Sequence, residues 1–161
     1  MKYLLFALLF ISSFAYTQDC SKYTKEYTDE VEGKSYTLAD NIVVSSNEQE
    51  GLIIMFVKLE KALAMSITSV GSGKCVDKGS QVNILFTDGT RMNLLNEVSF
   101  NCESKTTIYF EENRIDDYYA NELSTKKIKI MRVHKSSGFV EENFSEDQAD
   151  LFMNTFKCLY K

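Results

Sequence analysis

The fold class is decided by one stretch of sequence, Val82-Asn83-Ile84-Leu85-Phe86-Thr87-Asp88-Gly89-Thr90-Arg91-Met92-Asn93-Leu94-Leu95. Its two ends are rich in apolar residues, and a short polar segment separates them. Asp88-Gly89 is the dipeptide that supplies the positive φ angles of a tight hairpin turn. The stretch therefore predicts an antiparallel β-hairpin.

Further strands are predicted on both sides of this hairpin. They share runs of β-branched and aromatic residues, which are typical of sheets. The predicted strands are Ile42–Val44, Leu52–Val57, Ala64–Val70, Lys105–Glu111 and Lys127–Val133. The run Leu52–Val57 is apolar at every position, which indicates burial on both of its faces or a position sandwiched in the core. We expect six to eight antiparallel strands in total.

The C-terminus changes from strand to helix character. Ser145 and Gln148 have the spacing of a capping box, and Phe144 stands where a hydrophobic staple onto Ala149 would begin. An apolar stripe then recurs at helical spacing through Ala149, Phe152, Met153, Phe156 and Tyr160. Upstream, the acidic segment Arg114–Leu123 is expected to form one or two helical turns. The fold class is thus mainly β (α+β), an antiparallel β-sandwich-like sheet closed by one C-terminal amphipathic helix.

The first residues predict export. Lys2 precedes a nine-residue apolar run, Tyr3–Ile11, and small polar residues follow, as in a secretory signal peptide. The run is too short to span a bilayer. Cleavage after Ala15 or after Thr17 fits the small-residue rule, and lipidation of Cys20 is disfavoured because Asp19 precedes it. We assign residues 1–17 to the leader and 18–161 to a single domain that is secreted or periplasmic.

The charge of the chain argues against two classes of partner. The full chain has a net charge of −5, and loss of Lys2 with the leader lowers Lys plus Arg from 18 to 17 against 23 Asp plus Glu, which gives −6. Nucleic acids and anionic membranes both require a basic face. We therefore expect neither, and we expect no transmembrane anchor in the mature chain.

The four cysteines are Cys20, Cys75, Cys102 and Cys158. An even number of cysteines in an exported chain predicts two disulfides. Zinc is disfavoured because the cysteines do not occur in close pairs and no histidine lies near them. Spacing alone leaves three pairings open, and the order of the strands favours Cys75 with Cys102 and Cys20 with Cys158.

Three features of the sequence suggest a functional site, but each lacks part of the motif that such a site requires. Gly71-Ser72-Gly73-Lys74 lacks the remaining positions of a phosphate-binding loop and is interpreted as a flexible loop. His134, the chain's single histidine, has no Gly-x-Ser-x-Gly partner motif and is interpreted as an exposed residue at a strand end. The region Glu111–Asp117 could bind calcium weakly, but it lacks the alternate spacing of an EF-hand loop.

Acidic and aromatic residues leave two further hypotheses. A carboxylate pair could hydrolyse a glycosidic bond, although most acids are interpreted as solvated surface. The acidic runs are Asp29-Glu30-Glu32, Glu111-Glu112, Asp116-Asp117, Glu141-Glu142 and Glu146-Asp147. Tyr23, Tyr27 and Tyr36, or Tyr118 with Tyr119, could form an aromatic platform. We favour tyrosines that fill half-exposed sheet faces.

Three segments carry a resemblance to known proteins. They are Cys20 with Tyr23, Glu26, Asp29 and Glu30 before Gly33; the hairpin Ile84–Thr90; and Lys127–Val133 followed by a helix ending in Cys158-Leu159. Together they resemble small exported proteins of Bacteroidetes-type bacteria that have no assigned activity, and the Thr17-Gln18 junction is similar to leaders of that group. The resemblance implies export, a single domain and the Cys20–Cys158 tie, and it adds nothing on mechanism.

The sequence is therefore interpreted as an extracytoplasmic binding or structural module that is not catalytic. We expect no catalytic residue, no cofactor and no metal ligand, and a partner that is a protein or a glycan. The alternative is a small extracytoplasmic hydrolase that uses paired carboxylates. Thiol redox chemistry is disfavoured because the chain has no Cys-x-x-Cys motif.

Overall fold

The computed structural model describes residues 19–45, 49–71, 73, 75–111 and 117–160. The signal peptide predicted at residues 1–17 lies outside this part of the chain. The described residues form ten strands, two α-helices and one 3-10 turn. In chain order these are η1 (Cys20–Lys22), β1 (Thr24–Asp29), β2 (Lys34–Ala39), β3 (Ile42–Val44), β4 (Gly51–Lys58), β5 (Ala62–Val70), β6 (Gln81–Phe86), β7 (Arg91–Leu95), β8 (Lys105–Glu111), α1 (Asp117–Thr125), β9 (Ile128–Lys135), β10 (Gly138–Asn143) and α2 (Glu146–Leu159).

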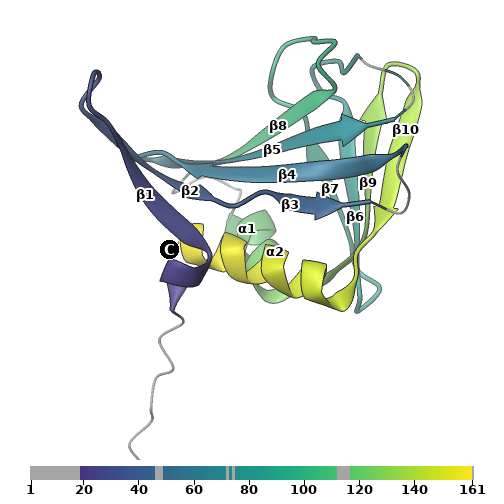
Figure 1. Ribbon diagram of the computed structural model, residues 1–161. Coiled ribbons are helices and arrows are strands. Elements are labelled where there is room, and N and C mark those ends of the chain that lie inside the picture. Colours follow the sequence, from purple (N-terminus) through teal and green to yellow (C-terminus); the bar gives the residue numbers. More distant parts are fainter. Residues whose placement is uncertain (1–18, 46–48, 72, 74, 112–116, 161) are drawn as a thin grey trace, which may run out of the picture.

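The strands form two antiparallel sheets. The six-stranded sheet has the order β1-β2-β4-β5-β8, with β3 also paired to β4, and the four-stranded sheet has the order β10-β9-β6-β7. Figure 1 shows the strands of the four-stranded sheet running across those of the six-stranded sheet at one end. The mainly β, antiparallel fold with a C-terminal helix is as predicted, and the arrangement resembles a sandwich.

The predicted β6–β7 hairpin is present, with Asn83 opposite Asn93 and Leu85 opposite Arg91. Its turn differs in detail from the expectation, because Gly89 has a positive φ of 84° and Asp88 does not. Gly89 donates to the Phe86 carbonyl (3.1 Å), and Phe86 donates to the Thr90 carbonyl (3.0 Å). These bonds describe a three-residue loop that ends in a left-handed glycine, for which only one positive φ is required.

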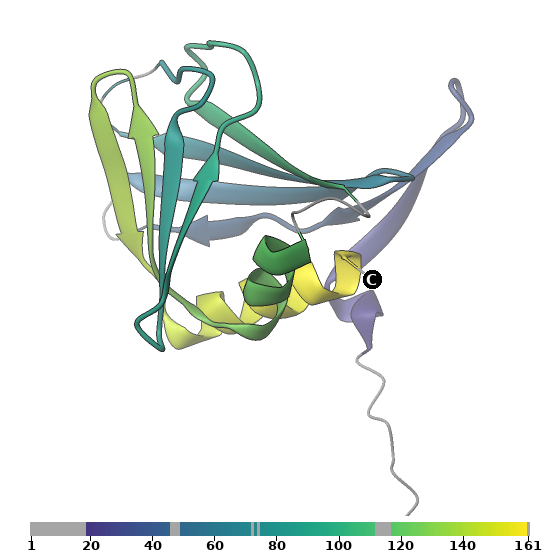
Figure 2. The ribbon, with the colours of Figure 1, turned by 180° about the vertical axis from the view of Figure 1, so that it is seen from behind.

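The core lies between the two sheets and α2. The capping box of Ser145 and Gln148 is formed, and it starts a helix that buries Ala149, Phe152, Thr155, Phe156 and Leu159. α2 lies against α1, β3 and β9, and Figure 2 shows both helices on one side of the six-stranded sheet. The rings of this helix meet sheet aromatics edge to face, with centroids 5.2 Å apart for Phe56–Phe152 and 5.1 Å for Phe110–Phe156.

The structure has more elements than the sequence pattern indicated. Ten strands are described where six to eight were expected, because β1, β2 and β10 carry few core residues and so lack an apolar signal. The Arg114–Leu123 segment contains α1, a helix of nine residues whose Ala120 and Leu123 are buried. Residues 112–116 are not described.

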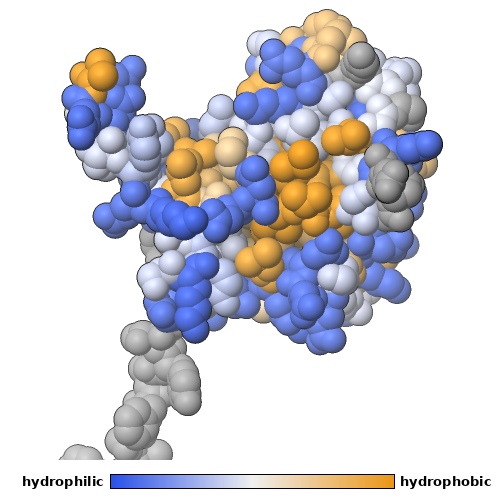
Figure 3. All heavy atoms as spheres, in the orientation of Figure 1, coloured by the Kyte–Doolittle hydropathy of each residue, from blue (hydrophilic) through white to orange (hydrophobic). Residues whose placement is uncertain are grey.

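The expectation for Leu52–Val57 was wrong in one respect. Leu52, Ile54 and Phe56 are fully buried, whereas the alternate residues of β4 are only half-buried. One face of β4 therefore lies in the core and the other faces outward. Figure 3 shows an apolar patch at this outer surface, over β3 and β4, where Val43 is 57% exposed.

Two disulfides fasten the ends and the loops of the domain. Cys20–Cys158 joins η1 to the end of α2 across a separation of 138 residues, and Cys75–Cys102 joins the loops after β5 and β7 across 27 residues. These are the pairs that the strand order favoured. Beside the second disulfide, Val76 and Asn101 exchange backbone hydrogen bonds of 2.8 and 3.0 Å.

Loss of the longer-range disulfide is expected to cost more stability. In the chain-entropy model the stabilisation grows with loop length, to about 5 kcal/mol for the Cys20–Cys158 loop and about 3.5 kcal/mol for the Cys75–Cys102 loop. Urea unfolding of Cys20→Ser/Cys158→Ser and of Cys75→Ser/Cys102→Ser should rank them in that order. A larger loss from the second variant would contradict this ranking.

One side chain that is buried in the core carries a carboxyl group. Glu142 on β10 is 1% exposed, and neither of its side-chain oxygens has a hydrogen-bond partner among the described residues. A buried carboxyl group without a hydrogen-bond partner costs free energy. We therefore expect Glu142→Met to raise the free energy of unfolding by about 1–3 kcal/mol, as measured by urea unfolding at neutral pH. The matched change at an exposed position, Glu103→Met, should alter it by less than about 0.5 kcal/mol; equal effects would refute this account of Glu142.

Candidate functional site

The clearest candidate site is a groove on the outer face of the four-stranded sheet. Alternate residues of β6, such as Val82 and Ile84, point into the core, so their neighbours Asn83 and Leu85 face outward. The groove has a volume of about 420 Å³, within the usual range of small-molecule sites. We call it the outer groove; it is lined by Asn83, Ile84, Leu85, Arg91, Asn93, Ile130, Arg132 and Glu141.

Strand register places four polar side chains of the outer groove in line across the whole sheet. Asn93 on β7 pairs with Asn83 on β6, Asn83 pairs with Arg132 on β9, and Arg132 pairs with Glu141 on β10. Directly paired residues point to the same face of a sheet. We call these four residues the polar row. Each ends in a planar amide, guanidinium or carboxylate group.

A second row lies beside the polar row. Arg91 on β7 pairs with Leu85 on β6, and Leu85 pairs with Ile130 on β9. Leu85 and Ile130 are half-buried, so they form an apolar strip between the polar row and the hairpin turn. The outer groove thus has hydrogen-bonding side chains in the polar row and, beside them, the apolar strip of Leu85 and Ile130.

Arg132 is held in one orientation. Its Nε donates to Glu141 Oε2 (2.7 Å), Nη2 lies 2.5 Å from the same oxygen, and the guanidinium carbon lies 4.3 Å from the centre of the Phe139 ring. Ion pairing and cation–π stacking together restrict the side chain. Because Glu141 balances its charge, Arg132 contributes fixed donors to the outer groove and little net charge.

Asn83 lies at the centre of the outer groove and keeps unused hydrogen-bonding capacity. Its Nδ2 lies 3.3 Å from Nε2 of His134, and its Oδ1 is buried and has no hydrogen-bond partner in the described part of the chain. A buried carbonyl left unpaired costs free energy. His134 itself is half-buried near the end of β9 and 6.0 Å from the Phe139 ring, rather than exposed as expected.

The side chain of Arg91, unlike that of Arg132, is not paired with any side chain in the described part of the chain. It is exposed on the edge strand β7, and its guanidinium has neither an ion pair nor a hydrogen bond with any of the described residues. Its five N–H donors are therefore available to a ligand. Sequence reasoning missed this site, because its residues come from four strands and only strand pairing brings them together.

Within the described residues, the acidic runs of the sequence do not converge on the outer groove. Glu141 lines it, but Glu142 points into the core on the opposite face. Glu146 forms an ion pair with Lys127 at the start of α2 (3.3 Å). The suggested calcium region, Glu111–Asp117, falls largely outside the described residues, as do Ser72 and Lys74 of the glycine-rich loop. Within the described part of the chain, no group of three or more His, Cys, Asp or Glu residues could hold a metal.

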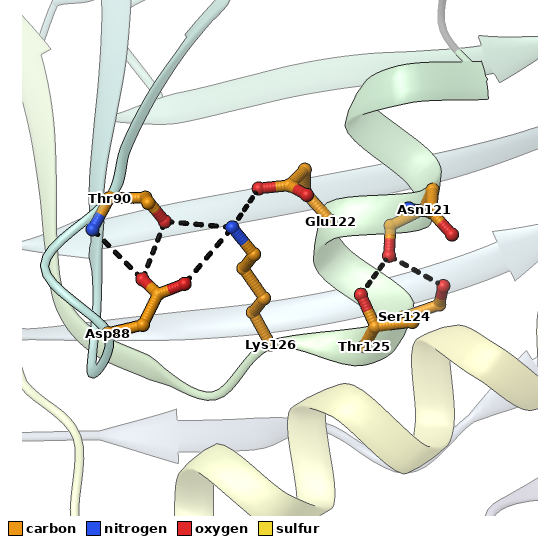
Figure 4. Close-up of polar contacts among 7 residues, drawn as sticks. All are labelled: Asp88, Thr90, Asn121, Glu122, Ser124, Thr125 and Lys126. Carbon is orange, nitrogen blue, oxygen red and sulfur yellow. Dashed lines mark hydrogen bonds and ion pairs between the residues drawn. The ribbon is translucent and has the colours of Figure 1, made fainter.

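A different carboxylate cluster fixes the β6–β7 turn to α1 (Figure 4). Lys126 Nζ lies 2.5 Å from Glu122 Oε2, 3.1 Å from Asp88 Oδ2 and 3.0 Å from the Thr90 hydroxyl. The pKa of Lys126 is raised, first because Glu122 and then because Asp88 accepts its hydrogen bonds. A cation separates the two carboxylates, so the cluster is a structural clamp and not an acid–base pair.

The tyrosines lie apart from the outer groove. Tyr27 and Tyr36 contact each other across β1 and β2 with tilted rings whose centroids are 5.0 Å apart, and Tyr118 lies against Tyr119 on α1 at 5.7 Å. The β1–β2 hairpin extends away from the rest of the molecule in Figure 1. Tyr27 and Tyr36 thus occupy a strand face, as favoured, although Tyr27 remains 53% exposed.

Comparison with known proteins identifies no relative. No protein-family model, curated protein or solved structure significantly matches the chain. None of the helices in the described residues combines the length and the apolar character needed to cross a membrane.

Asp88 gives the clamp a defined pH dependence. Its pKa is lowered from 3.8 to about 2, first by the hydrogen bonds that Thr90 donates and then by Lys126. A lowered pKa in the folded state stabilises the fold above the ordinary pKa, and this contribution is lost as the pH falls through the lowered value. Asp88→Asn should therefore be less stable than the wild type near neutral pH, and the difference should shrink between about pH 4 and 2.

Urea unfolding at a series of pH values measures this difference. Thr90→Val removes one of the donors to Asp88, so its stability should begin to fall at a higher pH than that of the wild type. A difference between Asp88→Asn and the wild type that stays constant down to pH 2 would rule out the Asp88 carboxylate as the source.

Proposed function

We propose that this protein is a secreted or periplasmic, non-catalytic binding module that takes a glycan in the outer groove. The observation that carries the proposal is the polar row, Asn93, Asn83, Arg132 and Glu141, in register across all four strands. The two disulfides, and the leader predicted at residues 1–17, support an oxidising, extracytoplasmic location.

The chemistry of the polar row suits a sugar. Each sugar hydroxyl both donates and accepts, and planar side chains can bind two neighbouring hydroxyls at once. Asn93 offers donors and an acceptor, Asn83 and Arg132 offer donors, and Glu141 offers acceptors. Leu85 and Ile130 provide an apolar surface for the C–H face of a sugar ring.

Rigid strands favour binding because they hold these groups in place before the ligand arrives. Arg132 is fixed by Glu141 and Phe139, so less side-chain entropy is lost on binding. A hydrolase would require two carboxyl groups on either side of the scissile bond. Among the described residues that line the outer groove, Glu141 is the one carboxylate, and it is neutralised by Arg132. These observations favour binding over hydrolysis.

Removal of the two amides tests this proposal. The double variant Asn83→Ala/Asn93→Ala should weaken glycan binding at least tenfold, because two sets of hydrogen bonds are lost at once. Calorimetric titration with cellotetraose, mannotetraose, galactotetraose and their uronate counterparts measures it. Asn41→Ala, at an exposed asparagine between β2 and β3, is the matched control and should bind as the wild type does. Absence of binding to every one of these tetrasaccharides would refute a glycan ligand.

A further inference from the structure

The charged side chains that line the outer groove do not cancel one another. Their net charge indicates which class of glycan the groove would bind. Arg91, Arg132 and Glu141 are the charged residues that line it. Glu141 is bound to Arg132, so these two charges cancel. Arg91 remains, and the lining therefore has one net positive charge in a chain whose net charge is −5.

Strand pairing places the positive charge of Arg91 next to the apolar strip of the outer groove. Arg91 lies opposite Leu85, and Leu85 is followed by Ile130 across the sheet. A sugar ring on Leu85 and Ile130 would have its hydroxyls along the polar row and one edge toward β7. The substituent at that edge would meet the guanidinium of Arg91.

A carboxylate is the group that best matches Arg91. The guanidinium fork donates two parallel hydrogen bonds to a planar carboxylate, and it remains charged at any physiological pH. A single negative charge balances the single free positive charge, whereas the Glu141 carboxylate in the same groove disfavours a doubly charged phosphate.

From these observations we infer that the ligand is an acidic glycan, one whose sugars carry a carboxylate as uronic acids do, and that Arg91 binds this carboxylate. The inference rests on the proposed function, because it assigns the ligand class of the same outer groove. Arg91 then determines which glycans bind, and the polar row supplies binding that neutral and acidic glycans share.

The experiment compares acidic glycans with their neutral counterparts. The probes are tetrasaccharides of galacturonate, of mannuronate and of glucuronate, each matched by the tetramer of the corresponding neutral sugar, titrated calorimetrically. At least one uronate tetramer should bind the wild type ten times more tightly than its neutral match, as expected for a charge-assisted bidentate pair. Arg91→Gln should abolish this preference, because binding of the uronate tetramer falls to the level of its neutral match.

The control removes the same charge elsewhere. Lys78→Gln, in an exposed loop before β6, should keep the full preference. An Arg91→Gln variant that keeps the preference would overturn the inference, as would equal binding of neutral and uronate tetramers, and in both cases the glycan-binding function would stand. A sulfated neutral tetramer that binds as tightly as the uronate would overturn the choice of a carboxylate. If none of the tetramers binds, the proposed function fails together with the inference.

Discussion

The packing of α2 against the inner faces of the sheets is the interaction on which the rest of the structure depends. Phe152 and Phe156 are fully buried and meet Phe56 and Phe110 edge to face, an arrangement that aromatic rings prefer. The helix also lies against β3 and β9, which belong to different sheets. One helix therefore contacts both sheets, and Cys158 near its end is linked to Cys20 before the first strand.

This packing determines which surfaces remain for function. The apolar side chains on the inner faces are used for the core, so outward side chains of the four-stranded sheet can be polar without loss of stability. The backbone below them is held by strand pairing on both sides of β6 and β9. Binding groups on such a support keep their positions better than groups on loops. The outer groove therefore combines a rigid base with side chains that the core does not require.

Sequence analysis predicted the features that depend on residues close to one another along the chain. The β6–β7 hairpin follows from Asp88-Gly89, and the start of α2 follows from Ser145 and Gln148; both structures are closed by contacts within four residues. The β1–β2 hairpin and β10 were missed, because their residues bury little and therefore show no apolar periodicity. The polar row could not be predicted, since it requires Asn83 and Arg132 to be paired across more than forty residues of chain. Glu142 was interpreted as surface because β10 was not predicted, and without the strand nothing indicates that Glu141 and Glu142 point to opposite faces.

The central claim is that the outer face of the four-stranded sheet is the binding surface. Amide NMR shifts of the 15N-labelled protein, followed during titration with the uronate tetrasaccharides, test this claim most directly. The account predicts that the largest shifts fall on Asn83, Arg91, Asn93 and Arg132, with the β1–β2 hairpin unaffected. Shifts concentrated on Tyr27 and Tyr36 would contradict it and would place binding on the projecting hairpin instead.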